Sequence, residues 1–121
     1  MKVTVRITQS FITAAKPLLK KYPSLSKDLL KLESELMRNP KTGTSLGHNA
    51  YKIRLKISSK GRGKSGGARV ISFLETFLIG EVINESEEVI VNLITIYDKA
   101  DTATITDKEL KDLIKSQSQN P

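Results

Sequence analysis

The sequence predicts an α+β domain in which two N-terminal helices pack on one face of a small antiparallel sheet and a further helix ends the chain. Residues 2–8 and 51–58 alternate polar and apolar side chains, which is typical of half-buried strands. Between them, apolar residues recur at helical spacing on both sides of a Tyr-Pro-Ser break at 22–24. Two further strand-like runs precede a last amphipathic segment, and this order favours helices packed on a sheet.

Both N-terminal helices are expected from their apolar spacing. Pro17 lies within the first, so that helix is either kinked there or begins again with proline in its first turn. The second carries a stripe of leucines and is closed by Asn39 and Pro40. The apolar positions of the two segments are Phe11, Ala14, Ala15, Leu18 and Leu19, then Leu25, Leu29, Leu32 and Leu36.

The remaining strands differ in their two faces. In 51–58 one face is apolar and the other is cationic, so we expect the face away from the helices to be open and positive. Residues 68–79 form a second strand region, and 88–97 are apolar on both faces, which predicts a central strand. The segment 75–87 is longer than a hairpin needs and is predicted to be an extended loop. The cations of the first of these strands are Lys52, Arg54 and Lys56.

The C-terminal helix has its own start signal. Thr106 and Glu109 match a capping box, and Leu110, Leu113 and Ile114 supply a buried side. We therefore expect one domain over residues 1–115, followed by a flexible tail over 116–121.

Composition limits the class of protein. The chain has 121 residues and no cysteine, which excludes disulfide frameworks and thiolate metal sites. No apolar run is long enough to span a membrane, and residues 1–6 do not form a signal-peptide core. We expect a cytoplasmic protein without cofactor, metal or membrane partner.

The charge is unevenly distributed. The formal net charge is +7, and the span from Leu36 to Leu74 has nine cations and no acid. From Glu75 to Asp101 seven acids accompany a single Lys99. A solvated charged face is the plain interpretation, but this polarity also favours an anionic partner such as nucleic acid.

Few residues offer other chemistry. His48 is the single histidine and lacks clustered carboxylates, so neither a metal site nor a histidine-based nucleophile can be assembled. The glycine-rich residues 61–67 lack the spacing of a phosphate loop. RNA needs no metal for cleavage because its 2′-hydroxyl can attack the adjacent phosphate while cations stabilise the added charge.

Three ordered blocks, at residues 51–55, 61–71 and 96–99, resemble the signature of RelE/ParE-superfamily toxins, closest to the HigB-like branch. The segments 20–25 and 107–110 resemble the same group. The resemblance implies a RelE-like fold, metal-independent cleavage of mRNA at the ribosome, and inhibition by a cognate antitoxin protein.

The resemblance also implies site residues. Lys52 and Arg54 match the catalytic cations of the strand, Arg69 matches the arginine that contacts the scissile phosphate, and Lys99 lies near a further basic position. Ile105 lies where many relatives carry a base-stacking tyrosine, and Tyr97 is the candidate to replace it. The remaining candidates for RNA binding are the cations Lys56, Lys60, Arg62 and Lys64.

Other functions stay open. A ParE-like inhibitor of DNA gyrase shares the fold and is not a nuclease. An inactive interaction module and a plain RNA-binding domain are also compatible with the charge, although three Phe and three Tyr supply few stacking platforms. Arg69 itself has a structural alternative, an ion pair with Glu75 or Asp98.

Overall fold

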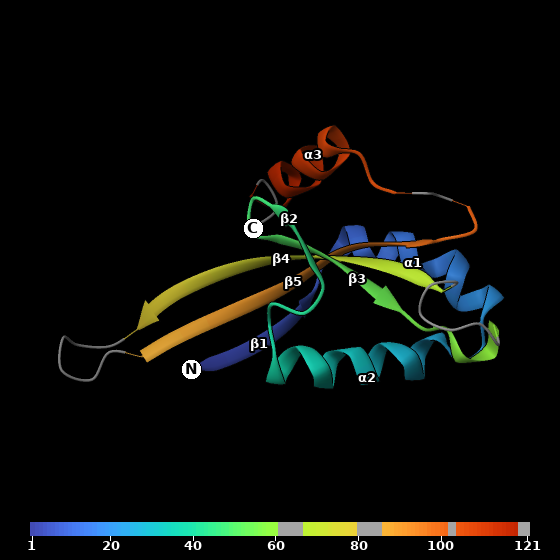
Figure 1. Ribbon diagram of the computed structural model, residues 1–121, viewed down its shortest axis with the longest axis horizontal. Coiled ribbons are helices and arrows are strands. Elements are labelled where there is room, and N and C mark those ends of the chain that lie inside the picture. Colours follow the sequence, from blue (N-terminus) through green and yellow to red (C-terminus); the bar gives the residue numbers. More distant parts are fainter. Residues whose placement is uncertain (61–66, 80–85, 102–103, 119–121) are drawn as a thin grey trace.

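The computed structural model describes residues 1–60, 67–79, 86–101 and 104–118. Within these residues the predicted α+β layout is confirmed (Figure 1). Two helices lie in the chain between the first strand and the other four, and one helix follows the last strand. The elements in chain order are β1 (Lys2–Ile7), α1 (Gln9–Lys21), α2 (Leu25–Arg38), β2 (Thr44–Gly47), β3 (Ala50–Leu55), the short 3-10 helix η1 (Ser58–Lys60), β4 (Ala68–Ile79), β5 (Ser86–Asp98) and α3 (Asp107–Ser118).

The described strands form one five-stranded sheet in the order β1-β5-β4-β3-β2. Strands β3 to β5 are antiparallel as predicted, and β2 also pairs antiparallel with β3. Strand β1, however, runs parallel to β5, so the sheet is mixed. Side chains alternate in the same way in parallel and antiparallel strands. The alternation in residues 2–8 therefore could not predict whether β1 pairs parallel or antiparallel. The internal position predicted for the run 88–97 is confirmed, because β5 lies between β1 and β4.

Helices α1 and α2 cover one face of the sheet and form the larger core with it. Phe11 and Leu18 of α1 and Leu36 of α2 are buried there, as their helical spacing predicted. Thr8 caps α1, because its hydroxyl accepts a hydrogen bond from the Phe11 amide at 3.3 Å. Helix α1 continues through Pro17 to Lys21.

The opposite face is less open than expected, because α3 packs on it (Figure 1). Leu110 of α3 is buried against Ala50, Ile71 and Ile94 of three different strands. The helix also reaches Ser118, three residues into the expected tail. Gln117 donates a hydrogen bond from Nε2 to Ser10 Oγ at 3.0 Å, which ties this end of α3 to α1.

Two further expectations need correction. Strand β2 lies in a segment for which the sequence predicts no strand, and it joins β3 through His48 and Asn49, both with left-handed φ values of 54° and 61°. The segment 75–87 is not simply a loop. Strands β4 and β5 stay paired out to Ile79 and Ser86 and project from the body of the molecule as an arm (Figure 1).

Candidate nucleic-acid interface

Three side chains predicted to act on RNA lie in one row across the sheet. Arg54 of β3 is the cross-strand partner of Arg69 of β4, and Arg69 is the partner of Tyr97 of β5. Directly opposite residues point to the same face, which is here the face that carries α3. Lys52 lies two residues before Arg54 and therefore shares that face. We call Arg54, Arg69 and Tyr97, with Lys52 beside them, the cationic row.

A bulge in β5 places Tyr97 in this row. The register steps from Ser72 opposite Leu93 to Ile71 opposite Thr95, so one extra residue stands in β5 at Ile94. If β5 ran from Leu93 to Tyr97 without the bulge, Tyr97 would lie four residues after Leu93 and share its face, which packs against α1 and α2. With it, Tyr97 joins the cluster under α3.

The segment that leads into α3 crosses the cationic row. The Ile105 amide donates a hydrogen bond to the Tyr97 hydroxyl at 3.2 Å. Lys52 Nζ donates to Thr104 Oγ1 at 3.5 Å, a longer contact. Ile105 is half-buried in the α3 cluster. This segment therefore limits how openly Lys52 and Tyr97 face a ligand.

The two arginines of the row differ in access. Arg54 is exposed, whereas Arg69 is only 5% exposed and donates from Nη1 to the Ala68 carbonyl at 3.2 Å. The two acids considered as ion-pair partners of Arg69 are bonded elsewhere: Glu75 lies 3.7 Å from Arg6 and accepts from Asn92, and Asp98 pairs with Lys60. A ligand thus meets Arg54 first.

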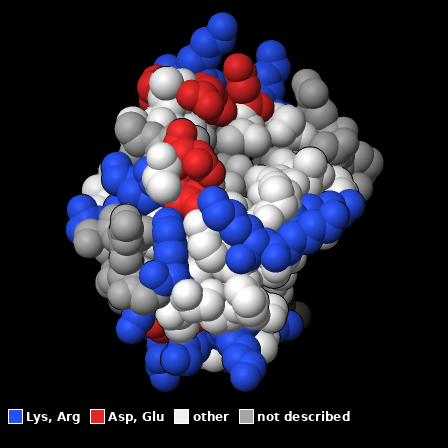
Figure 2. Space-filling model, turned by 90° about the vertical axis from the view of Figure 1, so that its right-hand side faces the viewer, with Lys and Arg blue, Asp and Glu red and all other residues white. Residues whose placement is uncertain are grey.

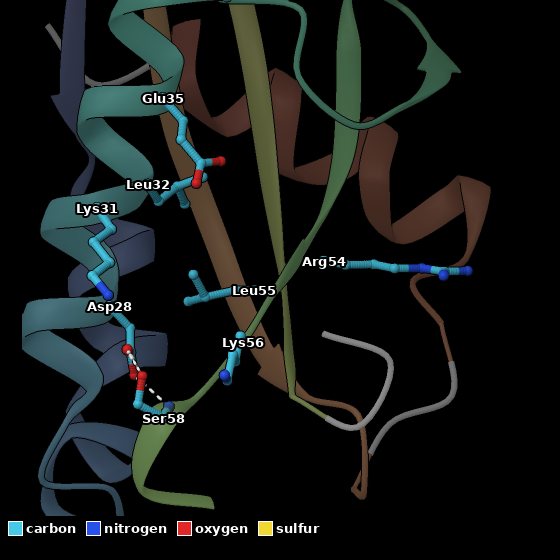
Figure 3. A pocket seen from close by; sticks show the side chains of 8 residues that line it. All are labelled: Asp28, Lys31, Leu32, Glu35, Arg54, Leu55, Lys56 and Ser58. Atoms are coloured by element: carbon cyan, nitrogen blue, oxygen red, sulfur yellow. Dashed lines mark hydrogen bonds between the residues drawn. The ribbon is translucent and has the colours of Figure 1, made fainter. Parts of the chain in front are cut away.

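Lys56 lies apart from the row, because β3 ends one residue earlier. With Arg54 among the other lining residues, it borders a hollow of about 160 Å³ between α2 and β3, and the Arg54 side chain extends away from α2 (Figure 3). Asp28 borders the same hollow and is almost fully buried. Its carboxylate accepts from Ser24 Oγ at 2.7 Å and from Ser58 Oγ at 2.6 Å, and it also accepts from the Ser58 amide. Burial alone would raise the pKa of Asp28, but these hydrogen bonds outweigh it and lower the pKa.

Lys60 has a partner within the fold. Its Nζ lies 2.7 Å from Asp98 Oδ1, and its side chain is 13% exposed. Tyr22 donates its hydroxyl to the other oxygen of the same carboxylate. Burial alone would raise the pKa of Asp98, but the bonds from Lys60, Tyr22 and the Ala100 amide hold it at about 2. This ion pair accounts for the charge of Lys60, so Lys60 is left out of the site proposed below.

The other predicted cations lie at the same end of the molecule or outside the described residues. Lys99 follows β5, and its amide donates to the Gly67 carbonyl at 3.1 Å. A Cβ at Gly67 would collide with the Leu55 carbonyl, so the close approach of β4 to the end of β3 requires glycine. Arg62 and Lys64 fall outside the described residues.

Neither Asp28 nor the cluster formed by Tyr22, Lys60 and Asp98 was predicted from the sequence. Ser24 and Asp28 stand at i and i+4, a spacing that predicts a local contact on a helix. The bond from Tyr22 to Asp98 joins residues 76 positions apart and has no such signal.

Seen from this end, the surface shows more Lys and Arg than Asp and Glu, set among uncharged residues. Figure 2 shows Lys and Arg side chains across the middle and bottom of the view and Asp and Glu mainly in its upper half. Among the described residues no group of three His, Cys, Asp or Glu could hold a metal ion. In the same part of the chain, no helix combines the length and the apolar character needed to cross a bilayer.

Comparison with family models, curated proteins and solved structures found no match to this chain.

Proposed function

We propose that this chain is a toxin of the RelE/ParE type, HigB-like in its motifs, which cleaves mRNA in the cytoplasm at the translating ribosome without a metal ion. The observation that supports this most is the cationic row. Residues that the motifs single out from three separate blocks of the sequence stand side by side on one face of the sheet.

The row suits cleavage through the RNA's own 2′-hydroxyl. The 2′-oxygen forms a bond to phosphorus as the bond to the 5′-oxygen breaks, one proton leaves the 2′-hydroxyl and another reaches the leaving oxygen. Arg54 and Arg69 supply fixed positive charge for the phosphate, and the planar guanidinium can grip two of its oxygens. Lys52 and Tyr97 are the neighbouring groups with protons to exchange, and Lys99 adds charge near the end of β5.

The proposal includes a protein partner. An acidic segment of a cognate antitoxin suits the cationic row, because opposite charge speeds encounter and neutralises the side chains that the substrate needs. Co-expression with the product of a neighbouring small gene is expected to restore growth and to give a stable complex.

One observation favours a second candidate. Arg69 is 5% exposed, and a guanidinium must be uncovered before it can contact a phosphate. A ParE-like gyrase inhibitor with this fold acts by binding alone and needs no accessible arginine at this position.

One experiment separates the two candidates. The chain is induced in bacteria, and new RNA 5′ ends are mapped with and without a block of translation. The nuclease gives cuts inside translated messages, and these disappear when translation stops, whereas a gyrase inhibitor leaves DNA breaks and no new RNA ends. Arg54→Ala is expected to reduce the cuts ~100-fold or more. Arg38→Ala, an exposed arginine at the end of α2, serves as the matched control and leaves them unchanged.

A further inference from the structure

The arm formed by β4 and β5 leaves one strand edge open. Pairing of β3 with β4 ends at Ala50 and Phe73, while pairing of β4 with β5 continues to Ile79. Among the described residues no strand lies against the outer edge of β4 beyond that point. The Leu74 amide makes the last bond on this side, to the Asn49 carbonyl at 2.9 Å.

That last bond shows which backbone groups point outward. Residues two apart in a strand direct their N–H and C=O groups to the same side. Because Leu74 donates away from β5, the amides and carbonyls of Thr76 and Leu78 face the open edge as well. Phe77 directs its own backbone groups towards β5 and its side chain to the sheet face that carries Phe73.

The side chains of this edge are apolar and exposed. Phe77 is 46% exposed and Leu78 is 69% exposed. Open edges are normally protected by charged residues, proline or a bulge, and the stretch from Thr76 to Leu78 has neither charge nor proline. A hollow of about 480 Å³ lies beside it, lined by Tyr51 and Asn49 as well as by β4 itself, and leaves room for a further chain.

We propose that a second copy of this chain occupies this edge, so that two β4 strands pair antiparallel across a two-fold axis at Phe77. In this arrangement the same edge of β4 forms the contact in both copies. Thr76 of one copy stands opposite Leu78 of the other, and each such pair exchanges two backbone hydrogen bonds. The two Phe77 side chains become direct cross-strand neighbours on one face, an arrangement that favours aromatic pairs.

The distribution of charge supports a second copy over a basic partner segment. The arm's acids Glu87 and Glu88 lie on β5, opposite Leu78 and Phe77, whereas the edge stretch of β4 from Thr76 to Leu78 has no charge for a basic segment to neutralise. The cationic row lies at the other end of β4, eight residues from Phe77, or about 25 Å along the strand. Pairing through the arms therefore keeps the positive ends of two copies apart and both rows accessible. An isologous contact of this kind also closes at two copies.

Sedimentation equilibrium on nuclease-treated protein tests the dimer. The expected mass is twice that of the 13.4 kDa chain, with little dependence on salt because the paired edge is uncharged. Leu78→Lys and Phe77→Lys are each expected to raise the dissociation constant at least ~30-fold, the effect of losing a central interface residue. Leu30→Lys on α2, where the leucine is 64% exposed, is the matched control and leaves the constant unchanged. Far-UV circular dichroism and thermal unfolding confirm that each variant is folded.

Cross-linking tests the register. The chain has no cysteine, so Phe77→Cys introduces a single thiol. Oxidation is expected to give a disulfide-linked dimer of Phe77→Cys, because directly opposite Cβ atoms lie about 4.5–5.5 Å apart. Leu78→Cys, whose two copies are offset along the strands, is expected not to cross-link. A wild-type chain that stays monomeric at its solubility limit would overturn the proposal. So would a dimer that Leu78→Lys leaves intact, or an edge that proves to bind a different protein in place of a second copy.

Discussion

The two faces of the sheet are made by the same strands but differ in what they hold. The face under α1 and α2 is closed by one large apolar core, to which Phe11, Leu36 and Val91 belong. The face under α3 has a smaller apolar cluster and, towards one end of the strands, the cationic row. In β3 the two kinds of residue alternate, so Ile53 and Leu55 face the helices while Lys52 and Arg54 face the other way.

The two faces therefore have different roles, one in stability and the other in the proposed chemistry. The helix-covered face contributes most of the apolar burial and keeps the strands rigid, and a rigid sheet can hold charged groups of the other face close together. Substitutions on the first face should then act through the stability of the fold. Substitutions in the cationic row should act on the chemistry of a folded protein.

The largest effect is expected from Phe11→Ala on the helix-covered face. Phe11 is 2% exposed, and its truncation leaves a cavity that should cost roughly 3–5 kcal/mol of unfolding free energy. Urea denaturation followed by circular dichroism measures this loss. Ile12→Ala, at a neighbouring position that is 40% exposed, is the control and should cost much less. Similar losses for both variants would contradict the packing described for α1.

Arg69→Ala addresses the other face. Loss of this charge should cost about 2.7–4 kcal/mol of transition-state stabilisation, or roughly 10²–10³ in cleavage rate. Thermal unfolding checks that this variant is still folded, because Arg69 is buried and bonds within the fold. Arg69→Lys keeps the charge but loses the planar fork, so it should restore little activity. A destabilised Arg69→Ala protein that still cleaves RNA would instead give Arg69 a structural role.

The smallest effect concerns the pH dependence of stability through Asp98, which faces Tyr22 and Lys60 on the helix side. Its pKa is about 2 in the folded protein and 3.8 in the reference state, so the unfolded chain binds more protons between these values. The carboxylate therefore contributes about 2 kcal/mol of stability above about pH 5, and this is lost as the pH falls towards 2. Denaturation of wild type and Asp98→Asn across this range should show a difference that shrinks with falling pH. A constant difference would show that Asp98 is not the titrating group.

The types of most elements could be predicted because their signals are local. The spacing of Phe11, Leu18 and Leu36 and the alternation of residues 51–58 describe helices and a strand without reference to the rest of the chain. The short strand β2 and the outer pairing of β4 with β5 were missed for the opposite reason. Four residues of β2 are too few to show a period, and Glu75 and Glu87 resemble loop residues until a partner strand is known.

The site was predicted in part. Lys52, Arg54, Arg69 and Tyr97 were named from motifs, and the register brings them together. The burial of Arg69 could not be read from neighbours in the sequence, because it depends on how the folded chain closes around the strands.

The sequence by itself determined most of the segments that are helix or strand, the α+β class, and the cations of one strand face. It could do so because propensity, alternation and charge are properties of neighbouring residues. Tertiary structure alone decided that β1 runs parallel to β5, that α3 covers part of the charged face, and that Asp98 bonds to Tyr22 and Lys60. It also decided the extra residue at Ile94 that turns Tyr97 towards Arg69. Each of these depends on the pairing of distant segments, whose energy is not gained until the whole sheet has formed.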